Sequence, residues 1–237
     1  FGPGVARRYP EGLVPQGISA ELIAAKWSMS RAALDDFALS SHRKAAAAWD
    51  AGLFDAETAP AEGLVRDECI RPTSTPEVLA GLKPAYYDPG YAERFPQIEW
   101  NITAGNASPV NDGASAVLIM SGDTAARLGL RPLARLHSFA VTGSDPLLML
   151  TGVIPATEKV LHRAGLTLAD IDLFEVNEAF SSVVLAWQQE LGADPAKVNV
   201  HGGAIAIGHP LGASGTRLTT TLAHAMRARG ARYGLQT

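Results

Sequence analysis

From residue 133 to the end of the chain, short apolar runs alternate with stretches whose apolar residues recur at helical spacing. This alternation is typical of strands connected by helices, and it predicts a layered α/β domain. The expected strands span residues 133–141, 171–176 and 198–208, the last passing into a glycine-rich loop. The expected helices span residues 156–164, 179–191 and 214–229.

The first half of the chain has a different pattern. Two helices are expected, over residues 19–26 and 30–49, with Ser30 as the N-cap of the second. Residues 55–98 are rich in proline, acidic residues and turns, which predicts a surface excursion around short helices such as 76–82. Finally, an apolar run at 116–120 predicts a buried strand, and 123–128 a short helix closed by Gly129.

Composition excludes several classes of protein. The 237 residues carry a net charge of −4 and no basic block, which argues against nucleic-acid binding. No apolar run reaches the roughly 18 residues of a membrane span. One cysteine, Cys69, excludes an internal disulfide framework and fits a reducing, cytoplasmic compartment. The opening Phe1-Gly2-Pro3-Gly4 resembles the interior of a loop, so we expect a piece of a longer protein.

A first candidate site is the sequence Asn177-Glu178-Ala179-Phe180, at the expected junction of a buried strand and a helix. Polar groups at such a junction are displayed at a sheet edge, beside the free N–H groups of the helix start. The structural alternative is that Asn177 only caps the helix, because asparagine is a favoured N-cap residue.

The second candidate is the loop 201–215, where five of fifteen residues are glycine. Such glycines allow close approach of the backbone to a ligand. His209 lies between Gly208 and Pro210, so its backbone is constrained, and a fixed imidazole suits a general base or an oxyanion donor. A structural histidine is the alternative. A phosphate-binding loop is disfavoured because no Gly-Lys-Ser/Thr ending follows.

Other site classes have weaker signals. The small residues 103–108, followed by Asn111-Asp112-Gly113, allow either an extended ligand against the backbone or simple turn chemistry. No metal site is expected, because the six histidines lack a metal-binding spacing. Acidic neighbours disfavour a thiolate at Cys69, which we interpret as structural. No Gly-x-Ser-x-Gly elbow is present.

Taken together, these motifs resemble the thiolase superfamily (acetyl-CoA acyltransferases and acetyltransferases) over its C-terminal two-thirds. Asn177-Glu178-Ala179-Phe180 and Gly208-His209-Pro210 resemble its signature pair, and residues 103–113 resemble a third block. The resemblance implies two similar α/β halves stacked as αβαβα layers, with an inserted loop domain. On this basis residues 1–110 are mostly loop domain, 111–132 end the N-terminal half, and 133–237 are the C-terminal half, stopping before its cysteine loop.

The resemblance also implies a reaction. In thiolases a cysteine thiolate attacks the keto carbon of a 3-ketoacyl-CoA, acetyl-CoA leaves, and a second CoA takes the acyl group from the enzyme. His209 matches the histidine that activates the nucleophile and donates into an oxyanion hole, and Asn177 the asparagine that holds a water there. A second cysteine is expected just after the final strand, which residues 234–237 resemble. Cys69 matches neither cysteine, so this chain alone should be inactive.

Substrate contacts follow from the same resemblance. Arg71 matches an arginine near the adenine of CoA. Residues that match the lining of the pantetheine tunnel are Ala104, Ala107 and Ser108. Residues that match positions near the thioester are Met149, Ala179 and Phe180. CoA is a substrate here, so no separate cofactor is implied. The expected partners are acyl-CoA, CoA and further copies of the chain, as a homodimer or homotetramer, without nucleic acid or membrane.

Departures from the family bear on the substrate. Pro15-Gln16 replaces a His-Met pair of short-chain biosynthetic thiolases, residues 149–153 depart from Met-Gly-x-Gly-Pro, and Pro109 replaces a glycine. These changes favour a degradative enzyme of fatty acid β-oxidation that accepts bulkier acyl groups. One alternative is a non-catalytic thiolase-like protein that binds acyl-CoA or lipid. Another is a decarboxylating ketoacyl synthase, which shares the fold but uses a different active-site set.

Overall fold

The computed structural model describes residues 2–61 and 63–237, and it is mostly helical. In chain order the helices are α1 (Pro3–Arg8), α2 (Gln16–Lys26), α3 (Arg31–Asp50), α4 (Pro76–Ala80), α5 (Pro89–Arg94), α6 (Gly122–Arg127), α7 (Val153–Ala164), α8 (Ser181–Leu191), α9 (Ala204–Ile207) and α10 (Ser214–Arg229). Short 3-10 turns are η1 (Leu150–Gly152), η2 (Leu168–Asp170) and η3 (Pro195–Lys197).

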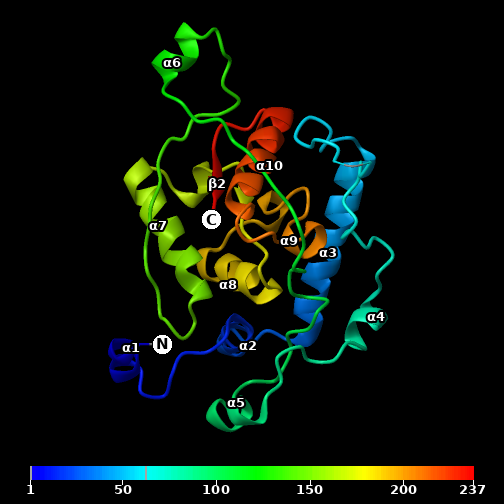
Figure 1. Cartoon of the computed structure of the whole chain (residues 1–237), viewed down its shortest axis with the longest axis vertical. Coiled ribbons are helices and arrows are strands. Elements are labelled where there is room, and N and C mark those ends of the chain that lie inside the picture. Colours follow the sequence, from blue (N-terminus) through cyan, green and yellow to red (C-terminus); the bar gives the residue numbers. More distant parts are fainter. Residues whose placement is uncertain (1, 62) are drawn as a thin grey trace.

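The sheet of the described part consists of β1 (Leu173–Glu175) and β2 (Gly234–Gln236). The strands are parallel, and Phe174 lies opposite Leu235 in the register. Val198 adds a parallel bridge to Phe174. Helix α10 contacts both strands, and Figure 1 shows it beside β2. The strand β1 is therefore buried between neighbours, with Asn177 two residues beyond its end.

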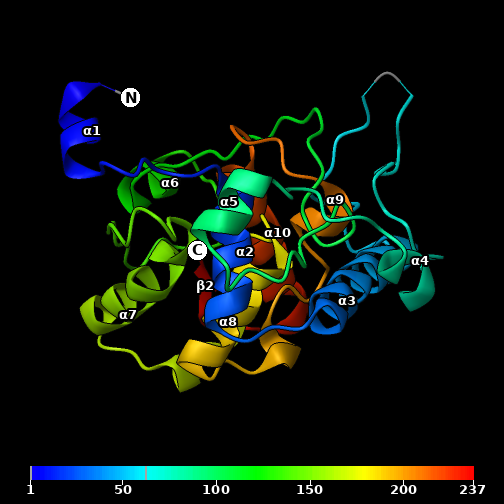
Figure 2. The ribbon, with the colours of Figure 1, turned by 90° about the horizontal axis from the view of Figure 1, so that it is seen from below.

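The hydrophobic core lies around this sheet and α8. Trp187 on α8 is fully buried, and its ring meets that of Phe174 edge-on, with centroids 5.2 Å apart. Its indole N–H donates to Thr157 Oγ1 of α7 at 2.9 Å. Helix α8 also contacts α2 and α3, and Figure 2 shows α2 lying across α8. None of the helices described is both long and apolar enough to cross a membrane.

Most of the predicted helices are confirmed. Ser30 caps α3 by accepting a hydrogen bond from the Ala33 N–H, and α7 ends at Gly165 in a left-handed conformation (φ 65°). Helix α10 has the predicted bounds, and α6 ends two residues before Gly129, which also has positive φ. The expected strand at 171–176 is present in a shorter form. The expected strand at 198–208 is reduced to isolated bridges at Val198 and Val200, and α9 follows them.

Two predicted strands are wrong. Residues 116–120 and 133–141 form no strand, and Ile119 and Phe139 are 67% and 78% exposed. A strand needs hydrogen-bonding partners on neighbouring strands, and the described residues offer none to these segments. In Figure 1 residues 110–149 run as one long trace around the helices, with α6 projecting from it. The expected layered αβαβα arrangement is therefore present only in part, as helices around a small sheet.

Candidate active site

His209 lies in the connection between α9 and α10. Its backbone N–H donates to Pro109 O at 3.1 Å, and the preceding Gly208 has a φ of 84°. A Cβ on Gly208 would come within 2.4 Å of several side-chain atoms of Asn111, so glycine is required for both conformation and space. The backbone of His209 is thus fixed between its own loop and the segment around Pro109.

The ring of His209 has a polar partner at each nitrogen. Nδ1 lies 2.5 Å from Ser214 Oγ at the start of α10, and Ser214 Oγ donates to Pro210 O at 3.1 Å. Because the one hydroxyl proton of Ser214 is used there, the network assigns a proton to His209 Nδ1, which donates to Ser214. Nε2 is then left with a lone pair, 3.4 Å from Nδ2 of Asn177.

The electrostatic surroundings of His209 favour the neutral form of its imidazole. Burial lowers the pKa of His209 below its ordinary value, and the positive charge of Arg217 lowers it further. A neutral imidazole with an unprotonated Nε2 can accept a proton, as a general base requires.

Asn177 comes two residues after the strand β1, where the motif predicted the end of a strand. Its backbone N–H donates to Thr237 O at 2.9 Å, while its side-chain Oδ1 is buried and has no hydrogen-bond partner among the described residues. The alternative that Asn177 caps the helix is wrong, because α8 begins at Ser181 with Phe180 in the capping position. The side chain of Asn177 is thus free to face His209.

Glu178 holds the surrounding loops together. Its fully buried carboxylate accepts hydrogen bonds from Ser41 Oγ at 2.6 Å, Asn199 Nδ2 at 2.9 Å and the Ile205 N–H at 3.1 Å. A Cβ on Gly203 would come within 2.4 Å of this carboxyl group, so the glycine permits the approach. Helix α3, the end of β1 and the loop before α9 therefore meet at one side chain.

Four of the predicted substrate contacts lie together beside this pair. Ala107 pairs with Phe180 in an antiparallel bridge, and the N–H and Oγ of Ser108 both donate to Ala179 O, at 3.0 and 3.1 Å. The next residue, Pro109, accepts the hydrogen bond from His209. The segment 107–109 thus connects Phe180 to the catalytic candidate His209.

The other three predicted contacts are less closely joined to the site. Met149 has a φ of 22° and lies between Leu148 and Leu150, which pack against the hydrophobic cluster that contains Phe180. Ala104 is exposed on the turn before Ala107. Arg71 is exposed, and its backbone N–H donates to His42 Nδ1 on α3 at 3.1 Å. None of the contacts described joins Arg71 to His209 or Asn177.

The chain's one cysteine is unlike a nucleophile. Burial raises the pKa of Cys69, and the negative charge of Asp67 raises it further, as the acidic sequence context predicted. Its backbone N–H donates to Asp67 Oδ1. Within residues 2–61 and 63–237, no group of three or more acidic, histidine or cysteine side chains could hold a metal ion.

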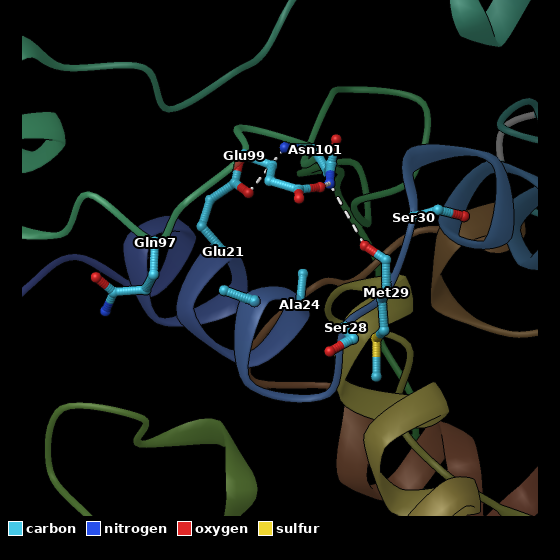
Figure 3. A pocket seen from close by; sticks show the side chains of 9 residues that line it. Glu21, Ala24, Ser28, Met29, Ser30, Gln97, Glu99 and Asn101 are labelled. Carbon is cyan, nitrogen blue, oxygen red and sulfur yellow. Dashed lines mark hydrogen bonds between the residues drawn. The ribbon is translucent and has the colours of Figure 1, made fainter.

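Two hollows differ in their relation to the site. One, of about 480 Å³, lies between residues 111–115 and 210–213 and so adjoins His209. The other, of about 260 Å³, lies at the end of α2, where Figure 3 shows Glu21 and Asn101 at its edge. Glu21 accepts from the N–H groups of Asn101 and Ile102 there. None of the candidate site residues lines this second hollow.

No sequence motif indicated that Ser214, Pro109 or Asn111 would hold the loop of His209 in place. Ser214 could have been noticed from its place five residues after His209, at the start of a predicted helix. The contacts of Pro109 and Asn111 link segments about 100 residues apart, and no local signal announces them.

Comparison with known proteins is consistent with this geometry. Residues 9–123 match the family described as thiolase, N-terminal domain, and residues 130–237 the family described as thiolase, C-terminal domain. The acetyl-CoA acetyltransferase of Paracoccus denitrificans is 47% identical over 229 residues, which cover 93% of this chain and 56% of that protein. The 3-ketoacyl-CoA thiolase of Erwinia tasmaniensis is 44% identical over 249 residues, covering all of this chain and 62% of that protein.

Solved structures give the same result. A crystal structure of human mitochondrial 3-ketoacyl-CoA thiolase has a TM-score of 0.87 at 43% identity, covering 94% of this chain and 56% of that one. A second crystal structure of the human enzyme, in complex with CoA, matches equally well. The chain thus spans a little over half the length of these relatives. It belongs to the thiolase family.

Proposed function

We propose that this chain supplies the histidine–asparagine half of a thiolase active site, in an enzyme that cleaves 3-ketoacyl-CoA with CoA. The observation that carries the proposal is the pair of side chains Asn177 and His209. These residues are 32 positions apart in the sequence, yet their side-chain nitrogens lie 3.4 Å apart. Ser214 orients the imidazole from its other side.

Each member of the pair has a separate role. His209 Nε2 accepts the proton of the attacking thiol and, once protonated, donates to the oxygen of the thioester carbonyl as negative charge develops on it. Asn177 Oδ1 is buried without a partner among the described residues, so it can accept a hydrogen bond from a water that completes the oxyanion-binding site. The first step, proton acceptance by Nε2, requires the neutral, oriented imidazole.

The nucleophile is not Cys69. A raised thiol pKa lowers the fraction of thiolate at neutral pH. In this proposal both catalytic cysteines come from thiolase segments other than residues 1–237, and the chain alone does not turn over substrate. The domain boundaries near residues 110 and 132 are part of the same proposal.

The substrate lies along the segment 107–109 and against Ala179, Phe180 and Met149. This placement is supported by the contacts of Ser108 and Ala107 with the start of α8, and by the relative that was crystallised with CoA. Ala104, on the turn before Ala107, serves the pantetheine chain, and Arg71, more distant, serves the adenine end. We further propose a degradative enzyme for bulky acyl groups, cytoplasmic and assembled as a homodimer or homotetramer.

A binding measurement tests the site in the chain itself. Acetyl-CoA is titrated into the chain while the imidazole signals of all six histidines are followed by NMR. We expect the His209 signal to shift and that of His224, on the far part of α10, to stay. Unchanged His209 signals at millimolar acetyl-CoA would refute the placement of the thioester.

An activity measurement separates the thiolase from a non-catalytic binding protein. In the enzyme that also carries the family's two cysteines, His209→Asn and Asn177→Ala should each lower kcat about 10²–10³-fold, as loss of an oxyanion donor does. The chain of residues 1–237 should not cleave acetoacetyl-CoA. In the complete enzyme, a higher kcat/KM for acetoacetyl-CoA than for a branched 3-ketoacyl-CoA would contradict the proposed substrate class.

A further inference from the structure

Three polar side chains follow one face of α10. Ser214, Arg217 and Thr221 are three and four residues apart, so they lie above one another on the helix. Ser214 contacts His209 Nδ1, at the first turn. Thr221 Oγ1 donates to Glu57 Oε1 at 3.0 Å, two turns further on. This face therefore runs from the active-site histidine to a carboxyl group of the segment that follows α3.

Arg217 lies between these two contacts. All three nitrogens of its guanidinium are buried, and they make no hydrogen bond to the described residues. A buried cation without compensation is costly, because it has lost its hydration. Two buried carboxyl groups also have unused oxygens, namely Oε2 of Glu57 and both oxygens of Glu175. No ion pair within 4.0 Å among the described residues includes Arg217, so these carboxyl groups can compensate its charge only over a longer distance.

The electrostatic effects place Arg217 among the same groups. Burial raises the pKa of Glu57 to about 7 and that of Glu175 to about 8, and in both cases the positive charge of Arg217 opposes the rise. Lys44 on α3 acts on Glu175 in the same direction as Arg217, whereas the negative charges of Glu178 and Glu57 raise its pKa further.

Arg217 also connects this cluster to the active site. The positive charge of Arg217 lowers the pKa of His209, whose ring also has Ser214 and Asn177 as polar neighbours. Glu175, in turn, is two residues before Asn177 on β1. Arg217, Glu175 and Glu57 thus come from α10, from β1 and from the segment after α3, and α10 itself contacts His209 through Ser214.

We propose that Arg217 is a positioning residue for this pair: it is the shared counter-charge of Glu57 and Glu175, and the cluster holds α10 and β1, and thereby His209 and Asn177, in one relative placement. One guanidinium with two carboxyl groups is electrically neutral when one carboxyl keeps its proton. The cluster is then balanced near neutral pH. The inference rests on the proposed role of His209, but its structural part does not depend on activity.

The test uses the chain of residues 1–237 and compares Arg217→Met with Arg229→Met. Both arginines are on α10, but Arg229 acts on His201 and not on His209. The imidazole pKa values are measured by NMR titration. We expect Arg217→Met to raise the pKa of His209 without changing that of His201. Arg229→Met should raise the pKa of His201 without changing that of His209. Arg217→Lys, which keeps the charge, should restore the low pKa of His209.

A thermal measurement tests the counter-charge itself. Arg217→Met should lower Tm by roughly 4–10 °C, and more at pH 8 than at pH 5, where both carboxyl groups are protonated. The double variant Arg217→Met with Glu57→Gln should lower Tm by less than the sum of the decreases in the two single variants. If Arg217→Met does not fold, Arg217→Gln replaces it in both measurements.

Two outcomes would overturn the inference. The first is a His209 pKa that does not change in Arg217→Met or Arg217→Gln. The second is strict additivity of Tm in the double variant. Neither depends on thiolase turnover. The two proposals can therefore fail separately. If acetyl-CoA does not shift the His209 signal but Arg217→Met still changes the pKa of His209, the proposed function is refuted and the role of Arg217 stands.

Discussion

Residues 171–237 and residues 110–149 have similarly apolar runs, but they differ in structure. In the first region Phe174 is 1% exposed and lies between β2, Val198 and Trp187. In the second, Phe139 is 78% exposed, and no strand forms. An apolar run therefore specifies a strand only where partners for its backbone groups are at hand.

The same difference decides where the active-site geometry is complete. The contacts of Asn177, Glu178 and His209 all come from α3, the segment 106–111 and residues 171–237. The segment 110–149 contributes to this geometry at its two ends, through Asn111 and the hollow beside residues 210–213, and through Leu148, which packs against the cluster that contains Phe180. Well-packed neighbours thus explain why the geometry around Asn177 and His209 is formed in this chain.

The largest expected effect compares two phenylalanines. Phe174→Ala should lower the free energy of unfolding by about 3–5 kcal/mol, because it opens a cavity in a packed core. Phe139→Ala should change it by less than about 0.5 kcal/mol, because its ring is already in contact with solvent. Urea unfolding followed by tryptophan fluorescence measures both. A similar loss in the two variants would mean that Phe139 is buried in solution and that the contrast between the regions is wrong.

The second comparison is between a buried, hydrogen-bonded glutamate, Glu178, and an exposed one, Glu158. Glu178→Ala removes the acceptor of three buried donors, and we expect a loss of about 3 kcal/mol in the free energy of unfolding. Glu158 on α7 is exposed and serves as the matched control, with Glu158→Ala expected to change stability by less than about 0.5 kcal/mol. Glu178→Gln, which keeps one carbonyl acceptor, should lie between them. Equal losses in the alanine variants would argue that the network around Glu178 contributes no stability.

Much of the helical structure could be predicted from the sequence, because its signals are local. Ser30 begins α3, Gly165 ends α7, and α10 has the predicted bounds. These features depend on capping chemistry and apolar spacing within one element. The strands at 116–120 and 133–141 were mispredicted because pairing depends on residues outside the segment, which no local pattern reports.

The candidate site was predicted to a similar extent and for the same reason. His209, Asn177, Ala107, Ser108, Ala179 and Phe180 lie together as the motifs indicated. Ser214, Glu178 and Arg217 received no individual roles, because their importance comes from contacts across the fold. Ser41 and Glu178, for example, are 137 residues apart. A motif identifies the residues that do chemistry more readily than those that hold them in place.

A pH measurement sharpens the contrast within the buried region. The pKa of Glu175 is raised to about 8 in the folded chain. Between the ordinary carboxyl pKa and pH 8 the folded state binds more protons than the unfolded state, so stability falls as pH rises, by at most about 1.4 kcal/mol per pH unit for one group. Glu175→Gln should flatten this fall, as measured by urea unfolding at pH 5 to 9. Glu158→Gln should leave the slope unchanged, and an unchanged slope in Glu175→Gln would contradict the burial of an ionisable Glu175.

The smallest expected effect compares two helix caps with the same geometry. Ser30 on α3 and Ser121 on α6 each accept a hydrogen bond from an N–H three residues later, at 3.2 Å. Ser30→Ala should cost about 1 kcal/mol of global stability, because α3 packs against α8 and α9 and unfolds with the core. Ser121→Ala should leave global stability almost unchanged, because α6 projects from the rest of the chain (Figure 1) and can unfold alone. Hydrogen exchange of the two helices measures this difference directly: amides of α6 should exchange faster in Ser121→Ala while those of α3 keep their wild-type rates. Faster exchange throughout the core in Ser121→Ala would show that residues 110–149 unfold together with residues 171–237, as one cooperative unit.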